Sequence, residues 1–333
     1  MLEEMQPTQT AWQSRVELVR KWGDVNTNGL LEVSTLGFSI PEIEGFIGYR
    51  IEAANAVVLG EPACALENKG ALAFAFQDYC ALKNLGVVYT IVSQDFAKWA
   101  QNNLEAATIE FGEKYIFDPH SNPMNNQGHK ASLVRRKFKH AIKEGAVVKE
   151  YLEYDILIEQ EIENASEEWL KSRHGPQIYL CHMTLFKNRY GKRWFYAERS
   201  GKIVGLLILN NIETKKGWLI TNVMMFKDAP HGLSELLIIS VLQLLEKENC
   251  RYVLAGPIPT KQLGKINGIT YFKAKLTGWI FKFAKFIFHL EGHEVFWDKF
   301  QPQSESSYLV FPKKNLTYSS IKALMRAYNV SVN

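Results

Sequence analysis

The chain has 333 residues, of which 47% are hydrophobic and 22% are charged, a balance typical of globular proteins with substantial cores. This composition excludes long disordered segments, and the length is enough for about two domains of ordinary size. The net charge of +4 is too small to indicate a polyanionic partner by itself. The four cysteines are scattered without a C-x-x-C pair, which argues against a structural zinc site and favours reduced core residues.

The amino terminus starts acidic and lacks an apolar segment, so it does not resemble a secretory signal. The densest apolar stretch, 279–290, is interrupted by Lys282 and Lys285. It is too short to cross a bilayer, which takes about 20 apolar residues. The sequence therefore predicts a soluble or peripheral protein.

The first predicted elements are two strands, 45–50 and 56–59, which should form a β-hairpin around a turn of small residues. A helix is expected from about 68 to 83, and Gly86 follows as a residue type that commonly ends helices. The β-branched run 87–92 should be the next strand.

Residues 130–143 (KASLVRRKFKHAIK) contain many cations and no acid. At 100° per residue the apolar side chains gather on one side, and a concentrated positive face covers the other. Like charges four residues apart repel by a few tenths of a kcal/mol, roughly, and a bound polyanion would remove that penalty. Two interpretations stay open, a face that binds nucleic acid and a solvated surface helix.

In the second half, strands 194–198 and 203–209 flank Ser200-Gly201, which is a strong hairpin signal. A third strand is expected at 218–226 and an amphipathic helix at 232–248. The last strand of this set should cover residues 252–255 and end at the following GPIP.

The order hairpin, helix, strand thus occurs twice, without a repeat in the sequence itself. Meandering strands followed by a β-α-β step predict an α/β fold with mixed sheets covered by helices. Either one architecture is duplicated or two unrelated α/β lobes follow one another.

The segment 273–290 (KAKLTGWIFKFAKFIFHL) has a narrow basic stripe on an otherwise apolar helical wheel. It is expected to be either a core helix with one exposed stripe or a helix in a bilayer interface. The two interpretations are compatible if a lipid enters beside the helix.

Several stretches together resemble one known domain, in the same order along the chain. They are 44–62 (EGFIGYR…VVLGEP), 110–119 (EFGEKYIFDP), 196–205 (YAERSGKIVG), 229–238 (APHGLSELLI), 254–259 (LAGPIP) and 299–312 (KFQP…YLVFP). They resemble the C-terminal catalytic domain of bacterial phosphatidylglycerol lysyltransferases, the multiple peptide resistance factor family.

This resemblance implies two tandem N-acetyltransferase-like (GNAT) lobes. Residues 1–128 would form the first lobe with an N-terminal extension, 129–145 the basic linking helix, and 146–333 the second lobe with the active site. The family transfers lysine or alanine from aminoacyl-tRNA to a phosphatidylglycerol hydroxyl, with no metal or dissociable cofactor. The implied location is the cytoplasm, at the inner face of the membrane.

Two features depart from the family. Its flippase region is absent from this sequence, so a separate lipid flippase is an expected partner. The family also tends to have GDP where Gly60-Glu61-Pro62 stands and an arginine near Met225. Met225 cannot hold a phosphate or a carboxylate, which leaves the donor and the acceptor open.

Residue roles follow from this comparison. Basic residues would hold the tRNA acceptor stem, namely Arg135, Arg136, Lys139 and Lys143. A carboxylate would hold the donor's α-ammonium, and a base or proton relay would be one of these acids or a histidine; the candidates are Asp228, Glu235, Glu198 and His231. Gly232 opens a helix whose N-terminus suits an anion, and Lys299 would meet an acceptor phosphate.

Each role has a plainer alternative. Glu235 would complement the helix dipole, Asp228 would serve a turn, and His231 would be solvated. The Gly-rich spacing typical of acyl-CoA binding is missing before this helix. The competing functions are aminoacyl transfer to a peptidoglycan precursor or protein N-terminus, acyl-CoA-dependent acetylation, and a non-catalytic membrane or RNA-binding module.

Overall fold

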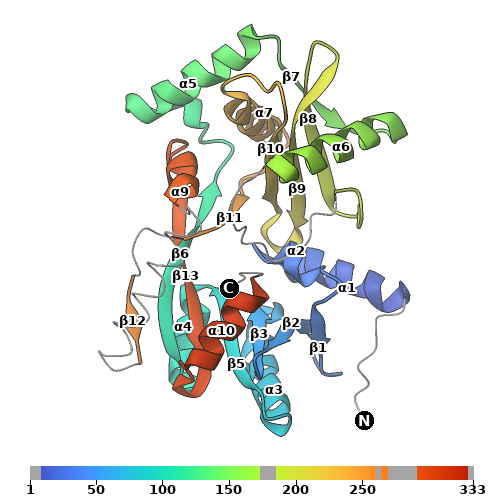
Figure 1. Ribbon diagram of the computed structural model, residues 1–333. Coiled ribbons are helices and arrows are strands. Elements are labelled where there is room, and N and C mark those ends of the chain that lie inside the picture. The colour runs from blue at the N-terminus through green and yellow to red at the C-terminus, as the bar shows by residue number, and fades with distance from the viewer. Residues whose placement is uncertain (1–8, 173–184, 260–263, 269–290, 329–333) are drawn as a thin grey trace.

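The computed structural model describes residues 9–172, 185–259, 264–268 and 291–328. They form two α/β lobes, one above the other in Figure 1, with helices on both faces of a sheet that continues from one lobe into the other. The strand order is β1-β2-β3-β5-β13-β6-β11-β10-β9-β8-β7, with β4 beside β2 and β12 beside β6. The mixed α/β class expected from the sequence is confirmed.

The first lobe begins with two helices and continues as a meander with helices on the sheet. Its elements are α1 (Gln9–Trp22), α2 (Thr27–Leu30), β1 (Leu36–Phe38), β2 (Gly45–Glu52), β3 (Asn55–Leu59), β4 (Ala63–Cys64), α3 (Lys69–Leu82), β5 (Gly86–Val92), α4 (Gln94–Asn103) and β6 (Ala107–Phe117). The hairpin predicted around residues 53–54 is confirmed. Ala53 and Ala54 both adopt positive φ there, as a two-residue hairpin turn requires.

The second lobe repeats the order of hairpin, helix and strand. Its elements are η2 (Pro123–Asn125), α5 (Gly128–Lys143), β7 (Val147–Tyr151), α6 (Ile156–Ser172), β8 (Lys192–Arg199), β9 (Lys202–Ile212), β10 (Gly217–Met225), α7 (Leu233–Lys247), β11 (Val253–Pro259) and α9 (Glu291–Asp298). Ser200 and Gly201 have positive φ in the β8–β9 turn, so this predicted hairpin is confirmed as well. The basic helix predicted at 130–143 is α5.

One predicted strand end is wrong. The strand expected to stop at GPIP continues as β11 to Pro259. Residues 253–255 of β11 pair with β10, but Pro257 and Pro259 pair with β6 alone. Because proline lacks an N–H donor, it is tolerated where one edge of a strand has no hydrogen-bonded neighbour, and a register shift between Ala255 and Pro257 accommodates it.

The C-terminal elements return to the first lobe. β13 (Gln303–Phe311) lies between β5 and β6, and α10 (Tyr318–Ala327) packs on β2 and β3. β12 (Ile266–Asn267) pairs with Thr108 and Ile109, near the start of β6. The division of the chain into 1–128, 129–145 and 146–333 stays a prediction, with the addition that the sheet of the first lobe takes a strand from the end of the chain.

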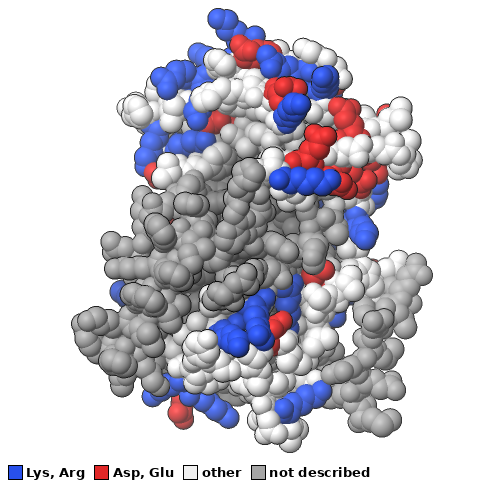
Figure 2. Space-filling model, viewed as in Figure 1, with Lys and Arg blue, Asp and Glu red and all other residues white. Residues whose placement is uncertain are grey.

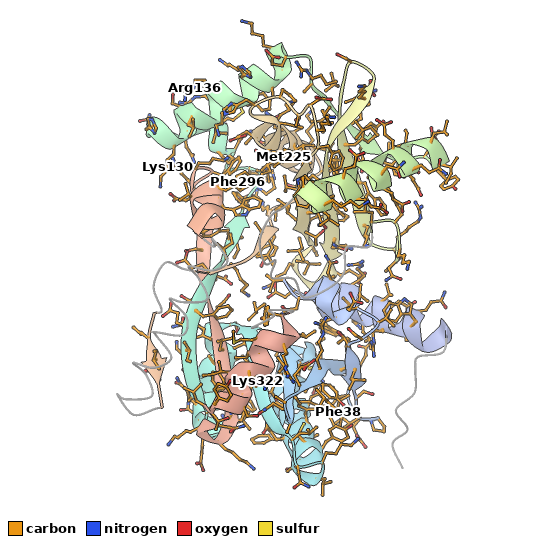
Figure 3. All side chains as sticks on the ribbon, viewed as in Figure 1. Phe38, Lys130, Arg136, Met225, Phe296 and Lys322 are labelled. Atoms are coloured by element: carbon orange, nitrogen blue, oxygen red, sulfur yellow. The ribbon has the colours of Figure 1, made fainter. Side chains whose placement is uncertain are left out.

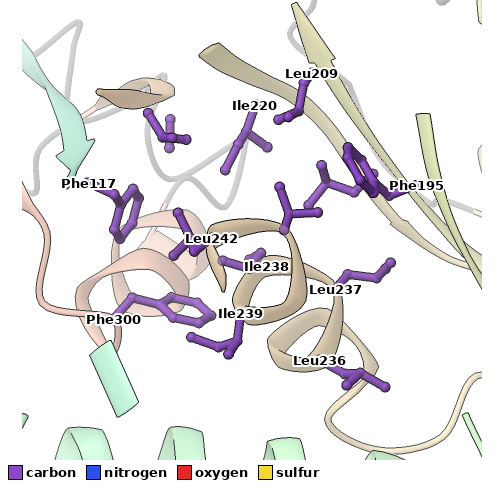
Figure 4. Close-up of a cluster of buried hydrophobic side chains, with 14 of the residues drawn as sticks. Phe117, Phe195, Leu209, Ile220, Leu236, Leu237, Ile238, Ile239, Leu242 and Phe300 are labelled. Atoms are coloured by element: carbon purple, nitrogen blue, oxygen red, sulfur yellow. The ribbon is translucent and has the colours of Figure 1, made fainter. Parts of the chain in front are cut away.

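Helix α7 is the centre of the core in the second lobe. Its buried residues, such as Leu237 and Ile238, pack between the sheet and the segment after α9, which contributes Phe300 (Figure 4). The corresponding core of the first lobe lies under α3 and α4, around Leu72 and Phe76. Burial of each such side chain stabilises the fold by roughly 1.5–3 kcal/mol.

The predicted aromatic and basic segment 273–290 lies outside the described residues. Within the described ranges, every helix is too short or too polar to cross a membrane.

Helix α5 crosses the beginning of α7 at very close range. Gly232, just before α7, has φ +93°, and a Cβ atom there would lie 2.2 Å from the carbonyl oxygen of Lys137. A glycine is therefore required twice, for its backbone conformation and for the approach of α5. This contact sets the distance between the two helices.

We expect Gly232→Ala to destabilise the fold through both effects. Gly128→Ala is the matched control, because Gly128 has φ +92° and open space around a Cβ position. Gly128→Ala should lower the free energy of unfolding by about 1–2 kcal/mol, through backbone strain alone. Gly232→Ala should cost a further ~1–3 kcal/mol from the overlap with α5. Urea unfolding measures both, and equal losses would contradict the importance of the contact.

Candidate functional site

Helix α5 is held against the second lobe by polar contacts at both of its ends. Near its start, the Lys130 Nζ lies 2.7 Å from the Asp298 carboxylate at the end of α9. Arg135 Nη1 donates to the carbonyl oxygens of Met124 and Asn126, at 2.7 and 2.8 Å. The Arg135 guanidinium therefore links α5 to the η2 segment.

The C-terminal half of α5 contacts the loop that leads into α7. The His140 Nδ1 lies 3.1 Å from the carbonyl oxygen of His231, and the two imidazole rings are 6.0 Å apart at their centroids. Just after the helix, the Glu144 carboxylate accepts from Arg199, which also donates to the carbonyl oxygen of Asp228. These contacts place α5 across the N-terminus of α7.

Between these contacts lies a buried group of charges, which we call the lysine–glutamate cluster (Lys137, Ser234, Glu235 and Lys299). Glu235, in the first turn of α7, is only 1% exposed. Its Oε1 accepts from the Lys299 Nζ at 2.5 Å and lies 3.2 Å from the Lys137 Nζ. Its Oε2 accepts from the Ser234 hydroxyl at 2.8 Å. Both carboxylate oxygens are therefore occupied.

Lys299 follows α9 and is itself buried, with 9% of its surface exposed. Its Nζ lies 3.9 Å from the ring centroid of Phe296 and 5.1 Å from that of Phe300. An ammonium over aromatic faces gains a cation–π attraction that partly replaces lost hydration. Phe296 lies on α9 where that helix comes up to α5, close to Lys130 in the view of Figure 3.

Burial shifts the pKa values of this cluster. For Lys299 burial is the largest effect and lowers the pKa; the ion pair with Glu235 opposes it, Lys137 adds to the lowering, and the net pKa is below the usual range. Burial by itself raises the pKa of Glu235, but the hydrogen bond and charge of Lys299 outweigh it, and the net pKa is lowered. Glu235 is therefore ionised at neutral pH.

The cluster holds two lysines against one carboxylate at the positive end of a helix, so its surplus charge is positive. Such a place suits a phosphate or a developing oxyanion. A lysine with a lowered pKa can also take part in proton transfer more readily than an ordinary one. The chemistry available here is charge stabilisation together with proton handling.

The outer side of α5 carries a second set of cations, which we call the outer stripe (Arg136, Lys139 and Lys143). All of them are exposed, and their spacing of three and four residues places them along one face of the helix. Figure 2 shows lysine and arginine atoms over the part of the surface that α5 occupies, at the upper left. Arg135, predicted with them, is instead half-buried at η2.

The structure brings some of the predicted site residues together and separates others. Gly232, Glu235 and Lys299 meet at the start of α7, and His231 and Asp228 are exposed in the loop before it. Glu198 lies apart on β8, where its carboxylate accepts from the Lys149 Nζ at 2.7 Å across the β7–β8 pair. The roles assigned to all of them stay predictions.

Lys137 and Ser234 were not among the predicted site residues. A signal for Lys137 was present, because it lies three residues after Val134 and four before Ala141, both fully buried. Helical spacing therefore places Lys137 at the border of the buried face. Glu235 was itself a predicted site residue, but its pairing with Lys137 could not be predicted in this way, since the two residues lie on different helices.

The described residues contain no group of three or more His, Cys, Asp or Glu side chains placed to hold a metal ion. Cys64, Cys80 and Cys250 are buried and free. Burial raises the pKa of the Cys64 thiol to about 11 and that of Cys80 to about 12, so these thiols are poor nucleophiles at neutral pH.

Comparison with known proteins identifies the relatives of this fold. Residues 30–311 match the family model described as phosphatidylglycerol lysyltransferase, C-terminal. The structure is similar to L-PGS from Bacillus licheniformis, with 16% identity, a TM-score of 0.80, and 99% and 98% of the two chains covered. It is similar to the C-terminal domain of a lysylphosphatidylglycerol synthetase from Agrobacterium fabrum, with 17% identity, a TM-score of 0.77, and 96% and 95% covered.

A more distant likeness is to the crystal structure of FemX, at 11% identity and a TM-score of 0.53, with 96% of this chain and all of that chain covered (100%). A search of curated proteins gives no match. At these identities the structural likeness establishes the fold alone. The expected tandem arrangement of acetyltransferase-like lobes joined by a basic helix is confirmed.

We expect Glu235→Gln to destabilise the protein at neutral pH by about 3–5 kcal/mol, because it leaves buried lysines without their counter-ion. The double variant Glu235→Gln with Lys299→Met should recover part of the lost stability, because it removes the buried ammonium of Lys299 together with the carboxylate that neutralised it. A double variant no more stable than Glu235→Gln would contradict the pairing.

The pH dependence has a definite sign. Since the pKa of Glu235 is lowered in the folded state, its stabilising contribution is complete above the ordinary glutamate pKa of about 4.3 and is lost as the pH falls through the folded value. The difference in unfolding free energy between the native protein and Glu235→Gln should therefore shrink in acid. Urea unfolding between neutral pH and pH ~3 measures it.

Proposed function

This chain belongs to the family of phosphatidylglycerol lysyltransferase C-terminal domains, and on that premise we propose that it transfers an aminoacyl group from aminoacyl-tRNA to a hydroxyl of a membrane phospholipid. The observation that carries the proposal is the layout of charge around α5. An exposed cationic stripe faces outward, and the buried lysine–glutamate cluster lies on the inner side of the same helix.

The outer stripe supplies the contact with the tRNA. Arg136, Lys139 and Lys143 would each neutralise a backbone phosphate and release counterions, which favours binding without reading the sequence. Arg135 serves this purpose indirectly, because its hydrogen bonds to Met124 and Asn126 hold α5 in place.

The cluster supplies charge for the reaction. The acceptor hydroxyl attacks the carbonyl carbon of the aminoacyl ester; a new C–O bond forms, the bond to the ribose oxygen breaks, and the hydroxyl proton ends on the ribose oxygen. Lys299 would hold the phosphate of the acceptor lipid beside the α7 N-terminus, with Glu235 fixing the direction of its ammonium. No covalent enzyme intermediate is needed, because the ester is already activated.

We also propose roles for the remaining acids and the histidine. Both oxygens of Glu235 have partners, and Glu198 is paired with Lys149. The carboxylate that would hold the donor's α-ammonium is therefore Asp228, which is exposed in the loop before α7. His231 in the same loop would carry the proton between the two hydroxyls.

The sequence before α7 disfavours acyl-CoA as the donor. In acetyltransferase-like folds the donor's phosphates bind the backbone N–H groups at the start of this helix, where a Gly-rich spacing is typical. That spacing is missing before α7.

The test is a transfer assay with labelled aminoacyl-tRNAs and vesicles that contain phosphatidylglycerol. We expect label in the chloroform phase, dependent on both tRNA and phosphatidylglycerol, and a loss of about 100-fold in kcat/KM for Lys299→Ala. Label in peptidoglycan precursor or protein, or tight binding of acetyl-CoA by calorimetry with no lipid label, would instead support the competing functions.

A second expectation concerns the salt dependence of tRNA binding. Replacing Arg136, Lys139 and Lys143 together by alanine should reduce the slope of log Kd against log salt concentration by about 2–3, because about one counterion is released per phosphate contact. The control is the alanine replacement of Lys98, Lys322 and Arg326, three exposed residues of the first lobe, which removes an equal amount of positive charge. If both triple variants change the slope equally, α5 is not the tRNA contact.

A further inference from the structure

One residue of α5 lies where the outer stripe and the lysine–glutamate cluster meet. Lys137 follows Arg136 of the outer stripe, yet its Nζ points inward and lies 3.2 Å from Glu235 Oε1. The same oxygen accepts from the Lys299 Nζ at 2.5 Å. Lys137 and Lys299 thus share a single acceptor atom, and 24% of the Lys137 side chain is exposed.

We propose that Lys137 is a positioning residue, which transmits the placement of α5 on its RNA ligand to the Lys299 ammonium through Glu235. The inference rests on the proposed function for its effect on turnover. The contact itself rests on the geometry of α5, α7 and the residue after α9.

The backbone makes this transmission direct. The carbonyl oxygen of Lys137 is the atom that approaches Gly232 most closely, so α5 and α7 touch at the residue whose side chain enters the cluster. A rigid shift of α5 therefore moves the Lys137 main chain and side chain together against the start of α7. Packed helices respond to such shifts by changing between defined contacts, since the interior has little free volume.

The Glu235 carboxylate has little freedom to absorb a change at Lys137. Ser234 binds its Oε2, and the two lysines meet at its Oε1. If Lys137 withdraws, the shared oxygen becomes available to Lys299 alone, and the ammonium of Lys299 is held more tightly. If Lys137 approaches, the two like charges repel and Lys299 is directed away from Glu235, toward a ligand.

Among the described residues, two charged groups lie close to the Lys299 ammonium, namely Glu235 from α7 and Lys137 from α5. The carboxylate of Asp298 is paired with Lys130, and the rings of Phe296 and Phe300 contact the ammonium. Removing the charge of Lys137 should therefore change the titration of Lys299.

The experiment compares Lys137→Met with Lys137→Arg in protein carrying ¹³C at the lysine ε carbons, with the Lys299 signal assigned from Lys299→Arg. In Lys137→Met the pKa of Lys299 should rise, because a neighbouring positive charge is gone, and in Lys137→Arg it should stay low. Lys139→Met, an exposed change on the same helix, should leave it unaltered. An unchanged Lys299 titration in Lys137→Met would overturn the proposal.

Kinetics give a separate readout. For Lys137→Met we expect kcat to fall about 10- to 100-fold while KM for aminoacyl-tRNA changes less than about twofold, with recovery in Lys137→Arg. A rise in KM with unchanged kcat would make Lys137 an ordinary RNA contact and contradict the inference.

A measurement on the unaltered protein covers the case in which Lys137→Met does not fold. Adding a 12-base-pair RNA duplex should shift the Lys299 signal, and the shift should vanish in the outer-stripe triple variant. RNA that binds without moving this signal would refute the coupling. Both NMR measurements keep their meaning if the chain transfers nothing to lipid, so a failure of the proposed function is distinguishable from a failure of the inference.

Discussion

A carboxylate buried at the first turn of α7 is the constraint on which the rest of the second lobe depends. Glu235 at 1% exposure would cost several kcal/mol as an isolated charge, so lysines must be brought to it. One comes from α5 and one from the residue after α9. Satisfying this one side chain helps to hold both segments against α7, next to the close contact at Gly232.

The continuous sheet places this cluster relative to the first lobe. β11 of the second lobe pairs with β6, and β13, which follows α9, pairs with β6 on its other side. Lys299 is therefore attached to a strand that belongs to the first lobe, while its partner Glu235 belongs to the second. Phe300, the next residue, packs with α7 in the core of the second lobe, so the segment between α9 and β13 connects the cluster to the shared sheet.

The charged side chains of helix α5 fall into two groups, those that contact neighbouring elements and those of the exposed outer stripe. Arg135, Lys137 and Lys130 contact η2, α7 and α9, whereas the outer stripe has no such contact among the described residues. This arrangement places a surface suited to a polyanion and a buried cation pair on opposite sides of one helix, about 10 Å across. In the proposed aminoacyl transfer the two sides would hold the RNA and the phosphate of the acceptor lipid.

The sequence alone determined several of the elements, because their signals are local. Helical spacing predicted α5 and α7, turn chemistry predicted the hairpins at Ala53-Ala54 and Ser200-Gly201, and the order of short motifs indicated the family. Only the tertiary structure decided which charges meet. Glu235 and Lys299 are 64 residues apart in the sequence. Arg135 donates a hydrogen bond to the η2 segment, whereas the next residue, Arg136, is exposed. Contacts between distant segments depend on how whole elements pack, and no spacing within one helix or strand encodes them.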